Sequence, residues 1–397
     1  MTFAAIYGSI RLGKRQYEGK KRKAVFVFGT AYGNAPDILR TQTMEYFEKY
    51  VSNCTAGTGN QSFFYTDNAE KIYTARAFFK PTVSGRHAYS FLFSNITDST
   101  YSDGSHSRCN RVLDEWHIDS ANVCTCDDFD AGVFAPLTFD GKKSKKVSPG
   151  EYLASDRIIL SPEDGQYICI ELSFHGRALP YHPETLVPVF VSDGEKFVEC
   201  KTMPLPAMIG CDLKVKKKIA FWGDSITQGI GTPPDSYSHY ADVAAKLLGN
   251  DYSYWDIGLG FGRASDAASD GAWAFKAKQN DLVTVCFGVN DIFKTGKSPA
   301  NELEKIVDIL KKSGVKVVIQ TVPPFDYDEI HKKIWSETND YIKNVLRFRV
   351  DGFLDVSEFL SESAENPEKA RFGGHPDAEG NSVWGKKLAG VLKDLLK

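Results

Sequence analysis

Long hydrophobic runs are missing from this sequence. No apolar stretch approaches the roughly 18 residues that a membrane-spanning helix needs. An excess of charge of either sign is missing too, since 48 Lys and Arg residues stand against 51 Asp and Glu residues. A chain without a basic excess lacks the electrostatic attraction that drives nucleic-acid binding. We therefore expect neither a membrane nor a nucleic acid as a partner.

Paired cysteine motifs are also missing. The eight cysteines are scattered, and the one close pair is Cys124 and Cys126, without the C-x-x-C or histidine spacing of a zinc site. Cys169 and Cys286 lie inside apolar runs, where a thiol most simply packs as a small apolar side chain. The pattern predicts reduced thiols and no zinc site, and we expect no cofactor.

The N-terminus lacks the pattern of a signal peptide. Its basic residues begin at Arg11, after the apolar stretch rather than before it. Together with reduced cysteines, this predicts a cytoplasmic protein; a secreted form processed from a longer precursor is the alternative. Nothing in the sequence predicts the oligomeric state.

The chain is long enough for two domains, and its pattern changes near residue 212. Residues 1–212 hold short apolar runs separated by Gly, Pro, Asn, Asp and Ser, which predicts a mainly β domain built as an antiparallel sandwich. Residues 35–50 are the one stretch of this part with helical periodicity. Its five histidines are irregularly spaced and are interpreted as surface or hydrogen-bonded core residues; they are His87, His106, His117, His175 and His182.

Residues 213–397 alternate strands with helices, which predicts a parallel sheet covered on both faces. The expected strands are residues 218–222, 252–259, 282–288, 315–322 and 352–356. The expected helices are residues 237–248, 266–278, 300–313, 328–348 and 379–396. His239 and His331 fall on these helices and are expected at the surface.

Polar motifs follow several of these strands. Ser225 follows the first strand, a glycine cluster at residues 258–262 follows the second, Asn290 follows the third, and His375 precedes the last helix. Because the carboxyl ends of parallel strands meet at one edge of a sheet, we expect these residues to converge. Taken alone, Gly-Asp-Ser is also common turn chemistry, so the convergence is what favours a catalytic role.

These residue types suit acyl transfer. A serine hydroxyl is a weak nucleophile until a base takes its proton, and His375 is the candidate base for Ser225. The oxyanion formed by attack on an ester needs positioned donors. The Ser225 backbone N–H, a backbone N–H of the glycine cluster and the Asn290 side-chain amide would supply them.

The four motifs, in this order, resemble the four blocks of the SGNH (GDSL-type) hydrolases over about residues 216–397. The resemblance implies a flavodoxin-like αβα domain that hydrolyses esters or thioesters through an acyl-enzyme, without a metal. It implies Ser225 as nucleophile, His375 as general base and acid, and Asn290 with a glycine in the oxyanion hole. The chain contains no G-x-S-x-G elbow, which argues against the α/β-hydrolase alternative.

Two positions depart from the family pattern. The family usually has an Asp three residues before the histidine, and Phe372 stands there in this chain. Asp377 is expected to cap the following helix, and Asp355 is another carboxylate that could approach. We favour a Ser–His dyad in which a backbone carbonyl orients His375.

The second departure is in the glycine block, where Asp256 replaces the usual leading Asn. Gly262 is the preferred oxyanion donor, and Gly260 is the alternative. Asp224 and Asp291 are expected to organise their loops by accepting hydrogen bonds from backbone N–H groups.

The N-terminal part carries a weaker resemblance. Residues 91–95, 152–157 and 168–174 are similar to the jelly-roll-like β-sandwich that precedes the catalytic domain in a group of bacterial SGNH proteins similar to carbohydrate esterases. This implies a serine esterase that removes small acyl groups, in particular acetyl, from a saccharide. Alternatives are a lipid-directed acylhydrolase or thioesterase with the same residues, and a non-catalytic binding protein.

Overall fold

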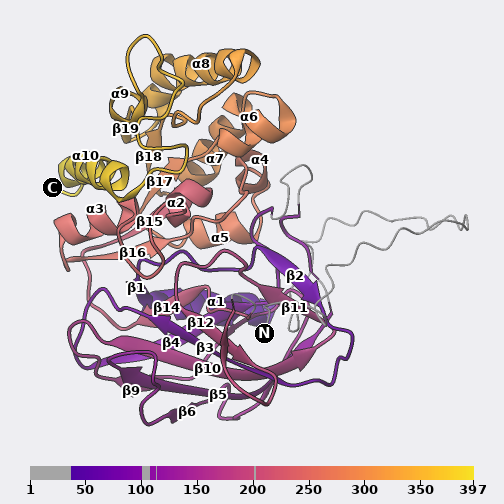
Figure 1. The fold of residues 1–397 in the computed structure, drawn as a ribbon. Helices are drawn as coiled ribbons and strands as arrows, with labels where there is room; N and C mark the ends of the chain where they lie inside the picture. The colour runs from indigo at the N-terminus through magenta and orange to yellow at the C-terminus, as the bar shows by residue number, and fades with distance from the viewer. Residues whose placement is uncertain (1–36, 101–107, 113, 201–202) are drawn as a thin grey trace, which may run out of the picture.

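The computed structural model describes residues 37–100, 108–112, 114–200 and 203–397. Figure 1 shows the chain in two halves, with the C-terminal half in orange and yellow above the N-terminal half in indigo and magenta. The expectation about a signal peptide concerns residues 1–36 and lies outside the described residues, as does His106.

A parallel sheet forms the centre of the C-terminal half. Its strand order is β19–β18–β17–β15–β16, which in chain order is 2-1-3-4-5 read from the opposite edge. The strands are the predicted apolar runs, with ends shifted by a few residues, because runs such as β17 are buried along their whole length. Their bounds are β15 Lys217–Gly223, β16 Tyr252–Asp256, β17 Leu282–Cys286, β18 Lys316–Gln320 and β19 Gly352–Leu354.

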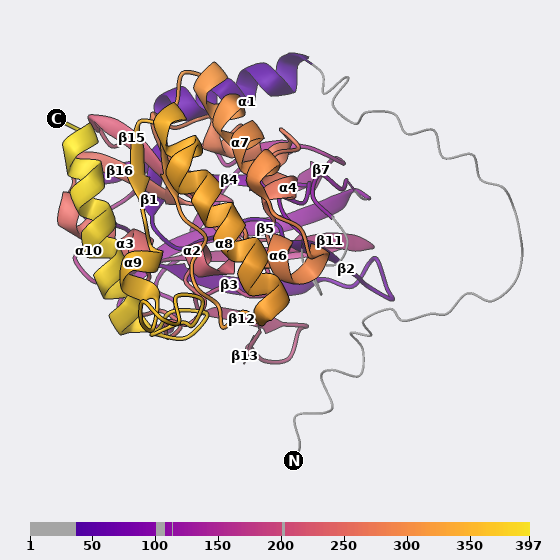
Figure 2. The same ribbon diagram turned by 90° about the horizontal axis from the view of Figure 1, so that it is seen from above.

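Helices cover both faces of this sheet. In Figure 2, α3 and α10 lie together on one side of the strands, and α7 and α8 lie on the other. The helix α7 shows why these segments pack as they do, since Leu303, Ile306, Val307 and Leu310 recur at helical spacing and are its buried residues. The bounds are α2 Ser225–Gln228, α3 Tyr240–Leu248, α4 Ala264–Ala267, α5 Ala272–Ala277, α6 Val289–Thr295, α7 Ala300–Lys312, α8 Glu329–Asn344, a 3₁₀ turn Leu346–Arg349, α9 Ser357–Leu360 and α10 Ala378–Leu395.

One predicted helix was wrong in extent. The expected helix over residues 266–278 is two short helices, α4 and α5, separated by a turn. Asp270 adopts a left-handed backbone conformation in this turn, with φ of 52°, and Gly271 follows it as the N-cap of α5. An Asp-Gly pair is typical turn chemistry and overrides the apolar periodicity around it.

The N-terminal half is built mainly from antiparallel strands, as predicted. A seven-stranded sheet has the order β13–β12–β3–β10–β5–β6, with β7 also paired to β5. Alternate residues of its central strands meet a second antiparallel layer in one apolar core that includes Phe79, Phe91 and Trp116. The bounds are β1 Val51–Cys54, β2 Ser62–Tyr65, β3 Tyr73–Phe79, β4 His87–Ser94, β5 Trp116–Cys126, β6 Ala135–Leu137, β7 Lys145–Val147, β8 Tyr152–Ala154, β9 Ile158–Leu160, β10 Tyr167–Gly176, β11 Ala178–Tyr181, β12 Val189–Ser192, β13 Val198–Glu199 and β14 Met208–Cys211. The predicted helix is α1 Asp37–Lys49.

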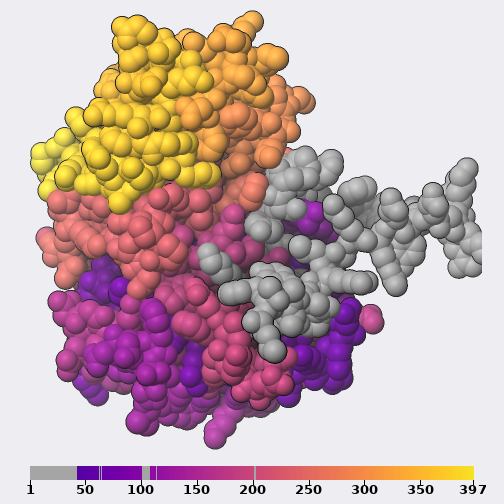
Figure 3. Space-filling view, in the orientation of Figure 1, coloured from indigo at the N-terminus to yellow at the C-terminus, as the bar shows by residue number. Residues whose placement is uncertain are grey.

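The two halves share one sheet. The strand β1 pairs in parallel with β16, where Asn53 lies opposite Tyr254, and antiparallel with β14, where Val51 lies opposite Cys211. The parallel sheet therefore continues through β1 into β14, β4 and β8 as a ten-stranded mixed sheet. Figure 3 shows the broad junction that results between the two halves.

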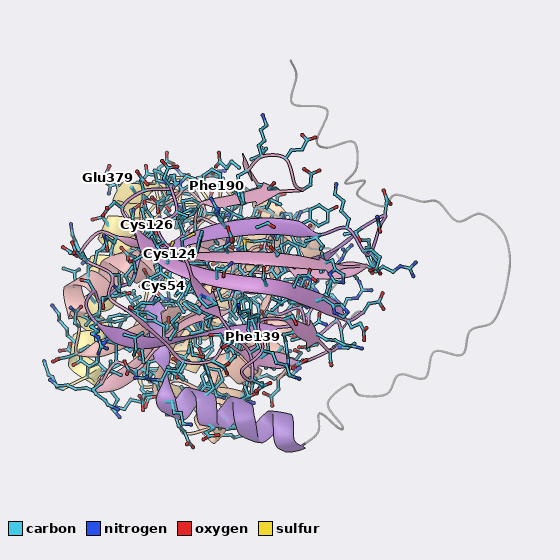
Figure 4. The ribbon with its side chains drawn as sticks, turned by 90° about the horizontal axis from the view of Figure 1, so that it is seen from below. Cys54, Cys124, Cys126, Phe139, Phe190 and Glu379 are labelled. Carbon is cyan, nitrogen blue, oxygen red and sulfur yellow. The ribbon has the colours of Figure 1, made fainter. Side chains whose placement is uncertain are left out.

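All eight cysteines lie in the described part of the chain and are free thiols. Figure 4 shows the side of the seven-stranded sheet that carries Cys124, Cys126 and Phe190. Burial raises the pKa of the Cys126 thiol to about 12 and of the Cys54 thiol to about 12. Among the described residues, none of the helices has both the length and the apolar character that crossing a membrane requires.

Candidate active site

Ser225 and His375 face each other at the edge of the parallel sheet. Ser225 is the first residue of α2, directly after β15, and His375 lies in the loop before α10. The Ser225 Oγ is 2.8 Å from the His375 Nε2. This distance is within the hydrogen-bond reach that proton transfer between a nucleophile and its base requires. The structure therefore brings together the two residues that the sequence placed 150 positions apart.

Asp224 sets the turn that presents Ser225. It is the N-cap of α2, and its Oδ1 accepts a hydrogen bond of 3.0 Å from the Ile226 N–H. This is the loop-organising role expected from the sequence. Among the described residues, no acceptor takes a hydrogen bond from the Ser225 N–H, so this donor is available at the helix N-terminus.

The surroundings of His375 hold no carboxylate partner among the described residues. Its imidazole packs edge-to-face against the Phe325 ring, with centroids 5.2 Å apart. Burial lowers the pKa of His375 from its ordinary value of 6.5, and burial is the one cause of this shift. A nearby carboxylate would act in the opposite direction and raise this pKa.

The two carboxylates that the sequence offered are engaged elsewhere. Asp377 is the N-cap of α10 and accepts a hydrogen bond of 3.0 Å from the Gly380 N–H, as predicted. Asp355 instead lies 2.6 Å from the Lys343 Nζ. Within the described residues no hydrogen bond reaches the His375 Nδ1, so its orientation by a backbone carbonyl stays a prediction.

Asn290 lies beside the glycine loop. It is in the first turn of α6, and its Nδ2 donates a hydrogen bond of 3.0 Å to the Gly262 carbonyl. An amide nitrogen carries two hydrogens, so this bond fixes the side chain and leaves the second hydrogen for another acceptor. Asp291 ties the same elements together, because its Oδ2 accepts 2.9 Å from the Ala264 N–H.

The two candidate glycines differ in how their N–H groups are used. The Gly260 N–H donates to the Gln228 Oε1 over 2.7 Å, which occupies it fully. The Gly262 N–H makes a longer turn bond of 3.2 Å to the Leu259 carbonyl. Phe261, between them, has φ of 56°, a left-handed conformation that side chains rarely adopt outside constrained sites. Of the two glycines, Gly262 has the N–H that can more easily turn toward a new acceptor.

Two carboxyl groups next to the proposed site residues are buried, those of Asp224 and Asp291. Burial, and then the charge of Asp291, raises the pKa of Asp224 to about 7. Burial also raises the pKa of Asp291 to about 7. In both cases the shift favours the neutral carboxyl, because burial penalises the charged form.

The predicted surface position of His239 is wrong. The sequence placed it on a surface helix, but it is the N-cap of α3 and is buried, at 3% exposed. Its Nε2 lies 3.2 Å from the Asp256 Oδ2, and Asp256 stands where the SGNH pattern usually has Asn. Burial alone would lower the pKa of His239, but the interaction with the Asp256 carboxylate, which accepts from the ring, raises it above its ordinary value. His331 is half-buried on α8, which is closer to the predicted surface position than the burial of His239 is.

One group of side chains has the proximity needed for a metal. Among the described residues, potential ligand atoms of His87, Cys211 and Asp212 lie within 4.8 Å of one another. These residues belong to β4 and to the end of β14, in the N-terminal half. Burial raises the pKa of the Cys211 thiol to about 12.

Gln228 is the residue near the site that sequence reasoning missed. It is the last residue of α2, three positions after Ser225, and is 1% exposed. The only signal in the sequence was this spacing, which puts Gln228 on the same short helix as the serine. Two of its partners, His182 and Glu184, come from the N-terminal half and could not be predicted from the motif.

Comparisons with known proteins found one family model and several solved structures that are similar to this chain. Residues 221–383 match the model of the GDSL-like Lipase/Acylhydrolase family. No curated protein matches the chain. A carbohydrate acetylesterase from Sinorhizobium meliloti is similar at 20% identity and a TM-score of 0.37, covering 45% of this chain and all of the other. An aryl esterase from M. smegmatis is similar at 19% identity and a TM-score of 0.38, covering 45% of this chain and 99% of the other. A family two carbohydrate esterase from Clostridium thermocellum, solved with cellohexaose, covers 87% of this chain and 99% of its own at 12% identity and a TM-score of 0.39.

Proposed function

We propose that this chain, a carboxylic ester hydrolase, works through an acyl-enzyme on Ser225. Its residues 221–383 place it in the GDSL-like lipase and acylhydrolase family. The observation that carries the proposal is the 2.8 Å contact between the Ser225 Oγ and the His375 Nε2. A base at this distance can take the hydroxyl proton as the oxygen attacks.

The reaction then follows in two halves. The Ser225 Oγ bonds to the ester carbonyl carbon while its proton passes to the His375 Nε2, and the carbonyl oxygen becomes an oxyanion. When the tetrahedral intermediate collapses, the bond to the alcohol oxygen breaks and His375 returns the proton to that oxygen. In the second half, His375 takes a proton from a water molecule as the water oxygen bonds to the acyl carbon. The bond from that carbon to the Ser225 Oγ then breaks, His375 returns the proton to Oγ, and the acid leaves.

Three donors stabilise the oxyanion in this proposal. The Ser225 N–H and the second Nδ2 hydrogen of Asn290 are the first two, and the Gly262 N–H is the third. The Gly262 N–H reaches the oxyanion by giving up its 3.2 Å bond to the Leu259 carbonyl. Gly260 is the weaker alternative, because its N–H is held by Gln228 at 2.7 Å.

Removing the Asn290 amide tests this arrangement. We expect Asn290→Ala to lower kcat with p-nitrophenyl acetate by about 10²–10³-fold, the usual loss for one oxyanion donor. The matched control is Asn301→Ala, which removes an exposed amide from α7 and should leave kcat unchanged. A kcat for Asn290→Ala equal to that of the control would remove Asn290 from the oxyanion hole.

We further propose that the acyl group is small, in particular acetyl, and that it is carried by a saccharide. The support is the resemblance of the N-terminal half to the sandwich of carbohydrate-esterase-like proteins, and the shortage of long apolar stretches around Ser225 where an acyl channel would need them. The alternative is a lipid-directed acylhydrolase or thioesterase with the same catalytic residues.

Acyl-chain length separates the two substrates. With p-nitrophenyl esters from acetyl to octanoyl, we expect kcat/KM to be highest for acetyl and to fall as the chain lengthens. Acetylated mono- and oligosaccharides should release acetate with the same dependence on Ser225. A kcat/KM that rises steadily toward octanoyl would refute the deacetylase proposal and support the lipid-directed one.

The finer descriptions of the molecule are part of the same proposal. We propose a flavodoxin-like C-terminal domain at residues 213–397, a jelly-roll-like sandwich at residues 1–212 and a cytoplasmic location. The strand order of the parallel sheet supports the first of these, and the antiparallel layers of the N-terminal half support the second.

A further inference from the structure

A chain of buried hydrogen bonds connects the N-terminal half to the glycine loop beside Ser225. The Gly260 N–H donates to the Gln228 Oε1 over 2.7 Å. The Gln228 Nε2 donates to the Glu184 carbonyl over 2.7 Å and lies 3.0 Å from the His182 Nε2. The His182 Nδ1 lies 2.9 Å from the Gly59 carbonyl. Gly59, His182 and Glu184 all belong to the N-terminal half, whereas Gln228 and Gly260 belong to the catalytic half.

The chemistry of these groups fixes the direction of every bond. A backbone N–H can only donate, so the Gln228 atom facing Gly260 is its carbonyl oxygen, and its amide nitrogen faces the other way. That nitrogen then donates to His182 Nε2, which must be an unprotonated acceptor. The proton of the neutral His182 ring is therefore on Nδ1 and is donated to the Gly59 carbonyl. His182 is 0% exposed and Gln228 is 1% exposed, so these bonds do not compete with bulk water.

The carbonyl of Gly260 is also held by residues of the N-terminal half. The Gln61 Nε2 donates to the Gly260 carbonyl over 3.2 Å, and the Ser99 Oγ lies 3.5 Å from the same oxygen. The approach is so close that a Cβ at position 260 would collide with the Glu184 and Gln61 side chains. Gly260 is thus held through both its N–H and its carbonyl, and a larger residue there would require the Glu184 and Gln61 side chains to move.

The hydrogen bonds that hold Gly260 also constrain the proposed oxyanion hole, because Gly260 and Gln228 are close in sequence to its residues. Gln228 is the last residue of the helix that Ser225 begins, so it is rigidly related to the nucleophile. Gly262 is two residues beyond Gly260, and its carbonyl accepts the hydrogen bond that fixes Asn290. The position of Gly260 relative to Gln228 therefore sets the distance between the nucleophile and two of the three proposed oxyanion donors.

We propose that the N-terminal half is a built-in part of the catalytic centre: His182, acting through Gln228, and Gln61 are positioning residues that hold the glycine loop in register with Ser225. The inference rests on the proposed function, because it concerns the oxyanion hole of that reaction. It assigns these two N-terminal residues a role in turnover that is separate from any saccharide binding by the sandwich.

Truncating the histidine tests the proposal. His182→Ala should lower kcat for p-nitrophenyl acetate by about 10–10²-fold and leave KM within about threefold, since a misplacement of about 1 Å in a donor costs transition-state binding more than substrate binding. His182→Gln should recover much of the loss, because its side-chain carbonyl can accept from the Gln228 amide. The matched control is His175→Ala, which removes another histidine of the N-terminal half, paired with Asp119 at 2.8 Å, and should leave kcat unchanged.

A double-mutant cycle separates positioning from general damage. If His182 acts through Gln228, His182→Ala combined with Gln228→Met should lose no more kcat than the more damaging single variant. Losses that multiply would overturn the proposal, and so would a kcat of His182→Ala equal to that of His175→Ala. Should His182→Ala fail to fold, judged by circular dichroism, Gln61→Met takes its place with the same expected fall in kcat at constant KM.

A readout that does not depend on turnover keeps the inference distinct from the proposed function. Hydrogen exchange measured on a peptide spanning residues 256–263 should be faster in His182→Ala than in wild type and unchanged in His175→Ala. Unchanged exchange in His182→Ala would overturn the inference even if the esterase is fully active. Activity that survives Ser225→Ala would instead overturn the proposed function and leave the exchange result standing.

Discussion

Ser225→Ala is expected to lower kcat for p-nitrophenyl acetate by about 10⁴–10⁶-fold while the fold stays intact. The substitution removes the oxygen that lies 2.8 Å from the His375 Nε2 and nothing else. The Ser225 N–H and the Asn290 amide stay in place, so a residual rate above that of water alone should persist. The measurement is steady-state kinetics on freshly purified protein whose circular dichroism and thermal midpoint match those of wild type.

A second serine close in sequence gives the control. Ser236 lies in the exposed loop after α2, and its Oγ donates to the Pro233 carbonyl. Ser236→Ala should keep wild-type kcat and KM. If Ser225→Ala kept a tenth or so of the wild-type kcat, a loss far smaller than nucleophile removal causes, another residue would have to be the nucleophile.

His375→Gln is expected to cause a loss of similar size, about 10⁴–10⁶-fold in kcat, because a serine without its base is protonated at neutral pH. Glutamine keeps a polar side chain of comparable length but cannot take up the Ser225 proton. The matched control is His331→Gln, which replaces a half-buried histidine on α8 that packs against the Phe293 ring. A His375→Gln variant as active as this control would contradict the assignment of the base.

The pH dependence of wild type tests how His375 is oriented. Only the neutral imidazole can act as base, and burial lowers its pKa below the ordinary value of 6.5. As the pH falls, kcat/KM should therefore stay high through pH 6.5 and decline only at a lower pH. An acid limb clearly above pH 6.5 would contradict the dyad, because it would require a carboxylate close enough to raise the pKa of the imidazole.

Much of the catalytic half could be predicted because its signals are local. Apolar runs such as residues 282–286 must be buried on both faces, which identifies parallel strands, and the ends of such strands share one edge of the sheet. That geometry, with His375 in the loop before the last helix, was enough to expect Ser225, Asn290 and His375 near one another. The break between α4 and α5 was missed because apolar periodicity was given more weight than Asp270-Gly271.

The contacts between the halves could not be predicted because they join residues far apart in sequence. The strand β1 has only four residues, Val51–Cys54, with no alternation to mark it, yet it connects the catalytic sheet to β14. His182 and Gln228 are single polar residues whose burial depends on the packing of both halves. His239 illustrates the same point. Its position at a predicted helix suggested exposure, and its burial follows from a contact with Asp256 on β16, which the sequence does not show.

The absence of the usual Asp is the clearest departure that the sequence did reveal. Phe372 occupies its position, and its carbonyl accepts a hydrogen bond of 3.1 Å from the Asp377 N–H instead. Among the described residues, the His375 ring has an aromatic neighbour rather than an anionic one, which explains the direction of its pKa. The proposed mechanism therefore gives the imidazolium of His375 less electrostatic support than a carboxylate would provide.

Trapping the covalent intermediate tests the central claim most directly. Wild-type protein mixed with p-nitrophenyl acetate and quenched in acid should gain the mass of one acetyl group, located by peptide mapping on Ser225. The Ser225→Ala variant should gain none, and Asn290→Ala should accumulate the adduct more slowly, because its oxyanion is less stabilised. An acetyl group found on another residue during turnover, or equally in Ser225→Ala, would contradict the account.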